Sequence, residues 1–555
     1  MNTKTLITGS IISFCLILPS LAFPRGGEAA TEESLPTRSG RFRRGGGSPV
    51  LSLSLEDAVL LALKRNRDLK VQTVLPKIKE TLIEEAKSPF DLDMSLEIKA
   101  GKDKTRSLST SSDSTEQDPQ DSQDPDLDDF IFKLRNALIS AEEETETQTT
   151  EGVFEISKLF STGTKLQLEL KSHYLDKESL TIYSDQFSIP SEGTGYATSG
   201  SLTITQSLLK DRGRKINLSL VDQAEIDHKI SLYELQQYII DLVAKVQKTY
   251  WDLILAEKTL HIRRKSMELA NQQLVETEER IRVGKQAESE AVAAQAEVAE
   301  GKGKLIDAES AMVQKRLDFL LLLNPEIDIL WDQGVELTTP PEPPPIDSGD
   351  IQNHISTAFR LRPDLNQTYL NLQKGDLEVV RTQNGLLPRL DFFFILKRIA
   401  NGPSFPSSFD EFDDYGYTAG LTLSRPWGNR TAESQSQQAN LERLQYRESI
   451  ESLKQEIQVE VRKALSEIQR YHEQVAASEA NRRWQEEKLK VEQEKFRLGR
   501  STNLLVFQAQ RDLIEAEVNK ITAAINQIKA SIDLQVAKGT LLRQWSIDIL
   551  SPLAN

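Results

Sequence analysis

Three long stretches of this 555-residue chain contain neither glycine nor proline, and these stretches limit the possible folds most strongly. They are residues 217–283, 431–498 and 500–538. Apolar residues recur within them at steps of three and four, as at Leu242, Val246 and Leu253, which is the spacing of an amphipathic helix. A continuous helix over 217–283 would be about 100 Å long at 1.5 Å per residue. These lengths predict coiled-coil-like packing of long helices rather than a globular core.

The same short pattern surrounds two glycines that lie 215 positions apart. Arg282, Gly284 and Gln295 recur as Arg497, Gly499 and Gln510. Other matches at this offset are Val246 with Val461, Lys248 with Lys463, Ile306 with Ile521, and Asp318 with Asp533. The chain is therefore predicted to be a tandem duplication. Each glycine is predicted at the tip where a long helix reverses into an antiparallel partner, because glycine tolerates positive φ. The alternative is a glycine tolerated inside a continuous helix.

Shorter segments between the helices alternate apolar and polar residues with a period of two. These segments are 91–100, 154–157, 165–174, 201–206, 390–397 and 420–424. The alternation predicts strands with one apolar and one polar face. We expect four strands in the first half, including a hairpin within 157–170, and two in the second. Residues 103–130, 191–200 and 400–414 are predicted loops, the first of them acidic and disordered.

A helix is predicted to open each half of the chain. In the first half it begins at the capping sequence Ser54-Leu55-Glu56-Asp57, bends at Pro76 and ends before Pro89. In the second half Ala358, Asp364 and Leu365 repeat Ala62, Asp68 and Leu69.

The N-terminus has the composition of a secretory signal. Lys4 precedes an apolar run over 6–21 and a small-residue site ending at Ala22, which predicts a signal peptide over 1–22 rather than a membrane anchor. The only cysteine, Cys15, lies inside it. We divide the remainder into a flexible arm (23–50), a first repeat (51–323), a Pro-rich linker (324–350), a second repeat (351–545) and a tail (546–555).

Charge and hydropathy bound the partners of the chain. The net charge of −16 argues against a general nucleic-acid binder, which needs a basic surface. No segment after the signal resembles a membrane-spanning helix, so a membrane role would need β-strands. Two to six strands cannot close a barrel alone. The predicted fold is mainly α with membrane β, in which duplicated helical hairpins accompany strands that several chains pool into one shared barrel.

Several motifs, taken in order, resemble the TolC-like outer-membrane efflux proteins. They are LSLEDAVLLALKRNRDL (53–69), RPDL (362–365), TQNGLLPRLDFF (382–393) and FRLGRSTNLLVFQAQRDLIEAE (496–517). The resemblance implies a homotrimer in a Gram-negative outer membrane, with one shared trimeric β-barrel in the lipid and a helical conduit across the periplasm. It also implies a periplasmic adaptor protein, an inner-membrane pump, and neither catalysis nor a cofactor. The export system would be a tripartite efflux or a type I secretion system.

The resemblance assigns the hairpin tips to adaptor binding. The residues concerned are Arg282, Val283, Gly284, Lys285, Arg497, Leu498, Gly499 and Arg500. Their basic side chains could also simply offset the helix dipole. Some family members close the periplasmic entrance with aspartates after the second tip glycine. The corresponding pore candidates here are Glu288, Glu290, Asn503 and Gln508, for which solvated helix positions are the alternative.

The sequence departs from the family in its strands. The family has two strands per half, so the extra hairpin would either widen the barrel or pack outside it. The turns from strand to helix at 205–215 and 424–430 match the family only in part. Aromatic residues near the second strand pair predict a girdle at the lipid interface. They are Phe392, Phe393, Phe394, Tyr415, Tyr417 and Trp427.

Two other classes of function compete with a duct. An enzyme is disfavoured, because the histidines 173, 228, 261, 354 and 472 lack ligand spacing and no phosphate-binding loop follows a strand. Four methionines, Met1 included, form no Met/His cluster, so no metal site is predicted. A secreted periplasmic coiled-coil adaptor or scaffold is the stronger competitor, but strands on both sides of a duplicated hairpin favour the duct.

Overall fold

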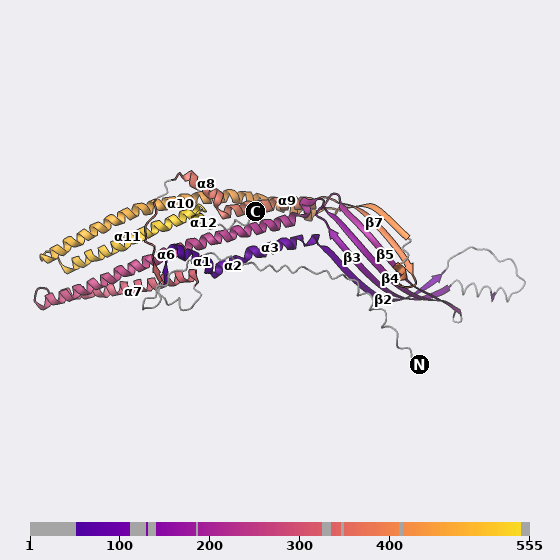
Figure 1. The fold of residues 1–555 in the computed structure, drawn as a ribbon, viewed down its shortest axis with the longest axis horizontal. Coiled ribbons are helices and arrows are strands. Elements are labelled where there is room, and N and C mark those ends of the chain that lie inside the picture. Colours follow the sequence, from indigo (N-terminus) through magenta and orange to yellow (C-terminus); the bar gives the residue numbers. More distant parts are fainter. Residues whose placement is uncertain are drawn as a thin grey trace, which may run out of the picture.

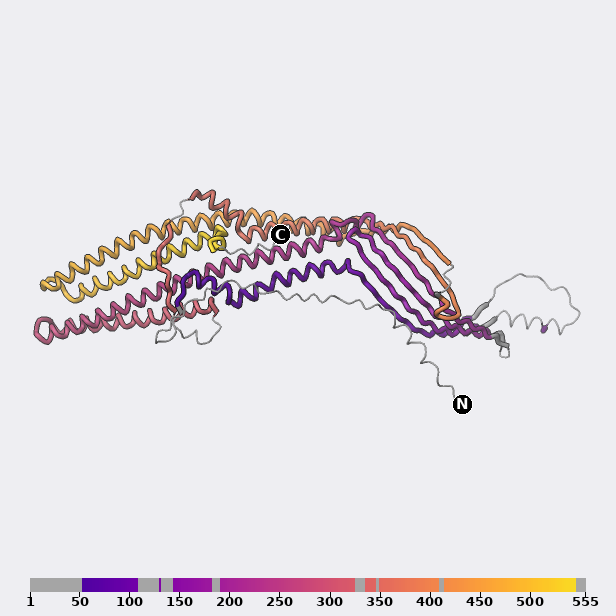
Figure 2. The backbone as a smooth tube through the Cα atoms, in the orientation of Figure 1, coloured from indigo at the N-terminus to yellow at the C-terminus, as the bar shows by residue number. Residues whose placement is uncertain are grey.

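The structure is an elongated body in which a bundle of long helices continues at one end into a slanted β-sheet (Figures 1 and 2). It is a computed structural model and describes residues 51–110, 129–130, 140–184, 187–324, 335–345, 349–409 and 414–545. The predicted signal peptide, the arm, the tail and most of the acidic loop 103–130 lie outside these residues.

The described helices include three long ones that are close to the predicted lengths. The helices are α1 (Leu55–Arg65), α2 (Arg67–Gln72), α3 (Val74–Lys87), α5 (Arg214–Asn217), α6 (Ser219–Arg282), α7 (Ser289–Leu323), α8 (Ile351–Leu361), α9 (Pro363–Gly385), α10 (Arg430–Arg497), α11 (Asn503–Ala537) and α12 (Leu541–Gln544). Short 3₁₀ turns cover Ser88–Phe90 and Ser407–Phe409. The long helices α6 and α10 have 64 and 68 residues, and their returning partners α7 and α11 have 35 each.

Both tip glycines lie where a long helix reverses, as predicted. Gly284 and Gly499 have φ of +70° and +71°. The N–H of Lys285 donates to the carbonyl of Arg280 over 2.8 Å, and the N–H of Gly284 donates to that of Ile281 over 2.9 Å. The second tip repeats both bonds. This pair of bonds is the Schellman motif, which satisfies the last carbonyls of a helix and needs a residue at positive φ.

The opening helix is three helices, so the predicted single helix bent at Pro76 is wrong. The capping box at Ser54 is present, but the chain breaks at Asn66 and again at Thr73. The Asn66 amide donates to the carbonyl of Leu322 over 3.1 Å, and its oxygen accepts from the N–H of Leu69. Pro76 falls in the first turn of α3, where its missing N–H removes no helical bond.

Six strands form one continuous antiparallel sheet. They are β2 (Leu92–Thr110), β3 (Ser140–Leu159), β4 (Thr164–Ser184), β5 (Phe187–Ser207), β7 (Arg389–Gly402) and β8 (Asp414–Ser424), in spatial order β2-β3-β4-β5-β7-β8. The predicted four and two strands are confirmed. The extra hairpin β3–β4 is paired on both sides within the sheet, which favours a wider barrel over a hairpin packed outside it.

The strands are longer than predicted. Residues 103–110 belong to β2, and 191–200, predicted as a loop, belong to β5. Residues 400–402 belong to β7 and Asp414 belongs to β8, so the predicted loop 400–414 is shorter than expected. The long ends are polar on both faces and therefore lack the alternation that marks a half-buried strand. Ladder hydrogen bonds and ion pairs such as Lys102 with Glu146 extend them instead.

The main apolar core lies midway along the molecule, where α1, α6, α7 and α11 meet. Tyr250 and Phe319 are fully buried there. The Tyr250 hydroxyl donates to the carbonyl of Leu53 and accepts from the N–H of Thr339. These bonds attach a small parallel sheet of β1 (Leu51–Leu53) and β6 (Val335–Leu337) to α6. A second cluster joins α8, α9 and α10.

Candidate functional site

The six-stranded sheet has one apolar face. Directly paired residues of an antiparallel sheet lie on the same face, and the register aligns the apolar residues of all six strands. They are Leu92, Met94, Leu96, Ile98, Phe154, Ile156, Leu166, Leu168, Leu170, Leu202, Ile204, Phe392, Phe394, Leu396, Tyr417, Leu421 and Leu423. Many of these side chains are exposed in the single chain.

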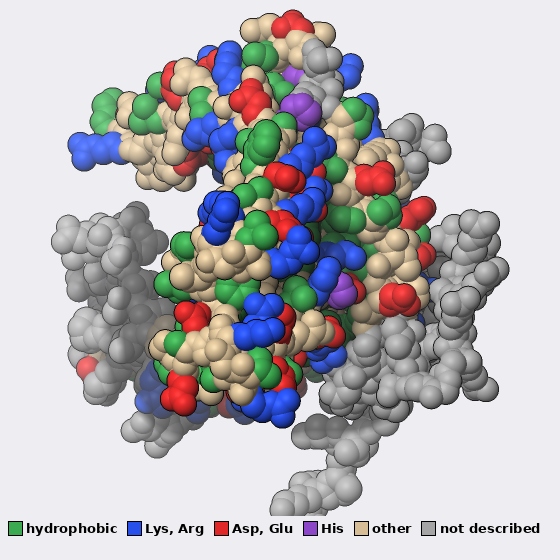
Figure 3. Space-filling view, turned by 90° about the vertical axis from the view of Figure 1, so that its left-hand side faces the viewer, with side chains coloured by type: hydrophobic (Ala, Val, Ile, Leu, Met, Phe, Trp, Pro, Cys, Tyr) green, Lys and Arg blue, Asp and Glu red, His purple; other side chains and the backbone are tan. Residues whose placement is uncertain are grey.

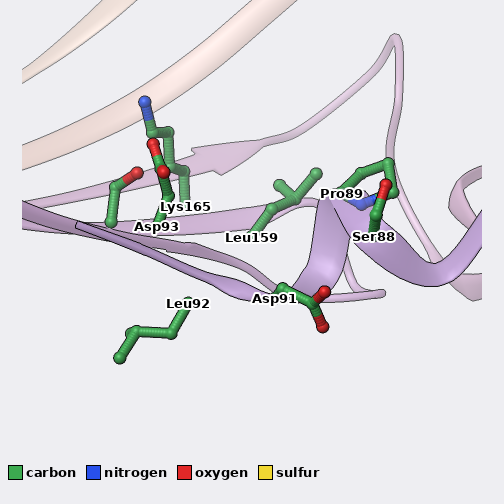
Figure 4. Close-up of a pocket in the computed structure, with 8 residues that line it drawn as sticks. Ser88, Pro89, Asp91, Leu92, Asp93, Leu159 and Lys165 are labelled. Carbon is green, nitrogen blue, oxygen red and sulfur yellow. The ribbon is translucent and has the colours of Figure 1, made fainter. Parts of the chain in front are cut away.

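The opposite face is polar. Asp93 and Lys165 project from one side of the sheet and Leu92 from the other (Figure 4). Residues paired on the polar face include Glu155 with Glu169 and Gln167 with Thr203. A sheet with this division suits a wall between an apolar and an aqueous medium.

Aromatic residues lie at the far end of the apolar face. The rings of Tyr174 and Tyr196 are 4.7 Å apart between centroids, and Phe405 lies 6.2 Å from Tyr196. Tyr415 and Tyr417 are exposed on the same face of the edge strand β8. Nothing in the local sequence marks Tyr174, Tyr196 and Phe405 as one aromatic group, because only the fold brings them together.

Phe393 does not lie on the face of the predicted aromatic girdle. It alternates with Phe392 and Phe394 and so lies on the polar face, where its ring covers Gly420. A Cβ added at Gly420 would come within 2.6 Å of that ring, so the glycine makes room for it. Trp427 follows β8 and is fully exposed.

The sheet is attached firmly to the helices. The Asn217 amide donates to the carbonyls of Ser161, Asp211 and Gly213. Asp211 and Asn384 exchange two hydrogen bonds of 3.0 and 2.8 Å. The bonds of Asn217 tie the β3–β4 turn to α5, just before α6. The bonds between Asp211 and Asn384 tie this junction to α9. A cavity of about 490 Å³ lies at the start of β2, lined by residues of 88–93 and by the ends of β3 and β4 (Figure 4).

Charged pairs join the two helical hairpins. Along the α6–α11 contact, Lys248 pairs with Asp533, Lys529 pairs with Asp252, and Arg263 pairs with Glu515 over 2.8 Å. Inside the second hairpin Lys520 and Arg482 both bind Glu479. Their hydrogen bonds lower the pKa of Glu479 to about 2.

The tips form the end of the molecule opposite the sheet, and a view of this end shows basic side chains beside acidic ones (Figure 3). Arg280 and Arg282 pair with Glu276 and Glu279 of the same helix. The second tip repeats this arrangement, with Lys495 and Arg497 pairing with Glu492 and Glu494. These ion pairs within each helix agree with the alternative that the basic side chains offset the helix dipole.

The two tips also touch each other and expose apolar side chains. The Arg280 guanidinium stacks on the Phe496 ring at 5.2 Å. Val283 and Leu498, at equivalent positions, are 59% and 65% exposed. Lys285 and Arg500 are exposed beside them.

The four pore candidates lie close to the tips in different surroundings. Glu288 and Gln508 are exposed, and Glu290 is half-buried in the first turn of α7. Asn503 is buried, and its amide donates to the Thr277 hydroxyl over 3.4 Å. Within one chain Asn503 therefore joins the second hairpin to the first.

Two kinds of feature are absent among the described residues. No group of three or more His, Cys, Asp or Glu residues among them is arranged to hold a metal ion. Among the helices that the structure describes, none combines the length and the apolar character needed to cross a membrane.

Comparison with known proteins agrees with this architecture. The family model described as "Outer membrane efflux protein" matches residues 181–324 and 354–540, more than half of the chain. No curated protein matches the sequence significantly.

Solved structures with the same fold cover most of the chain. The CmeC outer membrane channel of Campylobacter jejuni is 15% identical, with a TM-score of 0.61 over 90% of this chain and 88% of that one. The outer membrane protein VceC of Vibrio cholerae is 12% identical, with a TM-score of 0.60 over 87% and 96%. The open MtrE outer membrane channel of Neisseria gonorrhoeae is 14% identical, with a TM-score of 0.58 over 88% and 89%. The chain belongs to the outer membrane efflux protein family, and it is an outer-membrane channel of a tripartite efflux system that extends into the periplasm.

Proposed function

We propose that three copies of this chain form a passive duct, in which their sheets close one barrel in the outer membrane. The observation that carries this proposal is a sheet with an apolar face and two open edges. Among the described strands, β2 pairs only with β3, and β8 pairs only with β7. In lipid an unpaired strand edge leaves backbone polar groups unsatisfied. Pairing β8 of each copy with β2 of the next removes every edge.

The helical part has matching open edges. On α3, Val74, Ile78 and Leu82 are exposed, and on α10 Leu441 and Leu444 are exposed. These helices border the layer on opposite sides, since α3 packs on α6 and α10 packs on α9. A head-to-tail contact between unlike edges closes into a ring when the rotation fits.

The sheet dimensions suit a membrane barrel. The apolar stretch of β4 from Leu166 to Tyr174 is about 30 Å long at 3.4 Å per residue, which spans an apolar band of about 25 Å when the strand is tilted. Three six-stranded sheets would give eighteen strands, and barrels of about 16 to 18 strands enclose an aqueous channel. The apolar face would contact lipid and the polar face would line the channel.

The tips are proposed to bind a periplasmic adaptor that connects the duct to an inner-membrane pump. The proposed surface comprises Arg282, Val283, Gly284, Lys285, Arg497, Leu498, Gly499 and Arg500. Exposed Val283 and Leu498 would supply apolar contacts, and the cations around them would steer an acidic partner. Aspartate at both apolar positions should abolish co-purification with the adaptor and leave the trimer intact. Unchanged co-purification would contradict this surface.

Carboxylates behind the tips are proposed to shape the periplasmic entrance. Glu288 and Glu290 would attract cations, with Asn503 and Gln508 close by on the second hairpin. Neutralising both glutamates to glutamine should lower the cation preference of the conductance in planar bilayers, and an unchanged preference would contradict a pore position. The proposed division into a repeat at 51–323, a linker and a repeat at 351–545 gives each copy two such hairpins.

The decisive experiment is the mass and shape of the membrane-extracted protein in detergent, by light scattering with negative-stain imaging. We expect a hollow, elongated particle of three chain masses. A monomer or rod-like dimer that stays soluble without detergent would overturn the barrel and the duct.

A further inference from the structure

The internal duplication predicts how neighbouring copies dock along their helices. Inside the chain, long helix α6 of the first hairpin packs on returning helix α11 of the second. Adding 215 to each α6 number gives the equivalent α10 residue, and subtracting 215 from each α11 number gives the equivalent α7 residue. Each α6–α11 contact inside the chain thus has an α10–α7 counterpart that only two different copies can make in a closed ring.

The α7 helix carries an unpartnered copy of the stripe that α11 buries. On α11, Ile528 and Ile532 are 5% and 3% exposed in the core that α6 dominates, and Ile521 and Val536 pack against this core. The equivalent α7 residues are Val313, Leu317, Ile306 and Leu321, and they are 41–65% exposed. Within a single chain, the same apolar pattern is therefore buried on α11 and exposed on α7.

Of the three ion pairs along this contact, one keeps both of its charges at the equivalent positions. The ion pair of Lys248 with Asp533 maps onto Lys463 and Asp318. Lys463 is exposed and, within the described part of the chain, forms no ion pair. Asp318 is 61% exposed and only 3.7 Å from Lys315 of its own helix. Both members of the mapped pair keep the charge that the contact inside the chain uses.

We infer that α10 of each copy docks on α7 of the next copy in this register. Lys463 pairs with the partner's Asp318, and exposed Val459 packs on the partner's Leu321. The ion pair of Lys529 with Asp252 maps onto the partner's Gln314 on α7 and Glu467 on α10 of the first copy. There a hydrogen bond from the amide to the carboxylate replaces the ion pair. The occupant of the bare α7 stripe is therefore a second copy of this chain.

This inference rests on the proposed trimer and specifies its helical seam. Cross-linking tests it directly, because the only native cysteine, Cys15, lies in the predicted signal peptide. In the full chain, Lys463→Cys with Asp318→Cys and a short bis-maleimide should give covalent species up to three chains. Lys248→Cys with Asp533→Cys should link within one chain and give none.

A pair out of register serves as the matched control. Asp307 is also exposed on α7 and lies about 16 Å along the helix from Asp318 at 1.5 Å per residue. Lys463→Cys with Asp307→Cys should therefore give no multimers. Equal multimers from both pairs, or none from 463 and 318 in a particle of three chain masses, would overturn the register alone. A monomeric particle would overturn the proposed function itself.

Exchange of the charges tests the ion pair separately. Lys463→Glu and Asp318→Lys should each lower the temperature at which the trimer dissociates in detergent, and the double variant should restore it. If Lys463 or Asp318 acted only within its own helix, the second substitution would not restore the dissociation temperature. A double variant no more stable than either single variant would overturn the pair.

Discussion

At the residue scale, the tips depend on two backbone conformations. Gly284 and Gly499 adopt nearly the same positive φ, and a Cβ at either position would meet no neighbouring atom within 4 Å. The requirement for glycine is therefore conformational rather than steric, because a side chain at positive φ costs about 1–2 kcal/mol.

Replacing a tip glycine should loosen the tip locally. For Gly499→Ala we expect hydrogen exchange in the α10–α11 turn to accelerate about 5- to 30-fold, the equivalent of about 1–2 kcal/mol. The matched control is Gly303→Ala in the middle of α7, where φ is helical and space is free. That variant should be stabilised by about 0.5–1 kcal/mol. Equal behaviour of the two variants would contradict the role of φ.

The ion pairs of Glu479 should make the second hairpin sensitive to acid. Because its folded pKa is lowered to about 2, the carboxylate stabilises the folded state above its unfolded value near 4.5. This contribution is lost as the pH falls through the window between them. Thermal unfolding of the native protein and Glu479→Gln should differ at pH 6 and converge near pH 2. A difference independent of pH would contradict this account.

At the element scale, alternation along each strand separates two environments. Even-numbered residues of β4 from Leu166 to Leu170 lie on the apolar face, and their odd-numbered neighbours lie on the polar face. Adjacent positions of one strand should therefore respond in opposite ways to the same substitution.

Arginine at adjacent positions of β4 tests this division. Leu168→Arg places a charge on the proposed lipid face, at a cost of about 2–4 kcal/mol near the middle of the membrane. Gln167→Arg places the same charge on the polar face. The first variant should yield far less folded protein in the outer membrane, measured by heat-modifiable mobility on gels, and the second should resemble the native protein. Equal yields would mean that the faces are not divided between lipid and water.

At the scale of the whole molecule, the sheet and the helical part differ in their construction. The helices repeat as two hairpins, but the strands do not, since four come from the first half and two from the second. The family match begins at residue 181, so β2 and β3 precede it. The sheet is therefore the part of the molecule that does not follow the duplication.

Imaging along the long axis of the trimer should count the strands in the barrel. We expect class averages of the trimer by electron cryomicroscopy to show eighteen strands in the barrel. Because barrel diameter grows roughly linearly with strand number, the barrel should be about half again as wide as one with four strands per chain. Twelve strands would mean that one hairpin of each copy leaves the sheet in the assembly.

Local sequence by itself determined the helices, the tips and the faces of the strands. Runs free of glycine and proline predict α6 and α10 to within a few residues. The tip glycines and the alternation in 91–100 are equally local signals, because periodicity and backbone preference act over neighbouring residues. The duplication is visible in the sequence because these local patterns recur 215 positions apart.

Only the tertiary structure decided what depends on distant partners. The break at Asn66 depends on the carbonyl of Leu322, and residues 191–200 are strand because β4 and β7 pair with them. The register places Phe393 on the polar face, and Lys248 meets Asp533 only because α6 and α11 pack together. Hydrogen bonds, ion pairs and open edges between segments far apart in the chain leave no periodic trace, so the fold alone could reveal them.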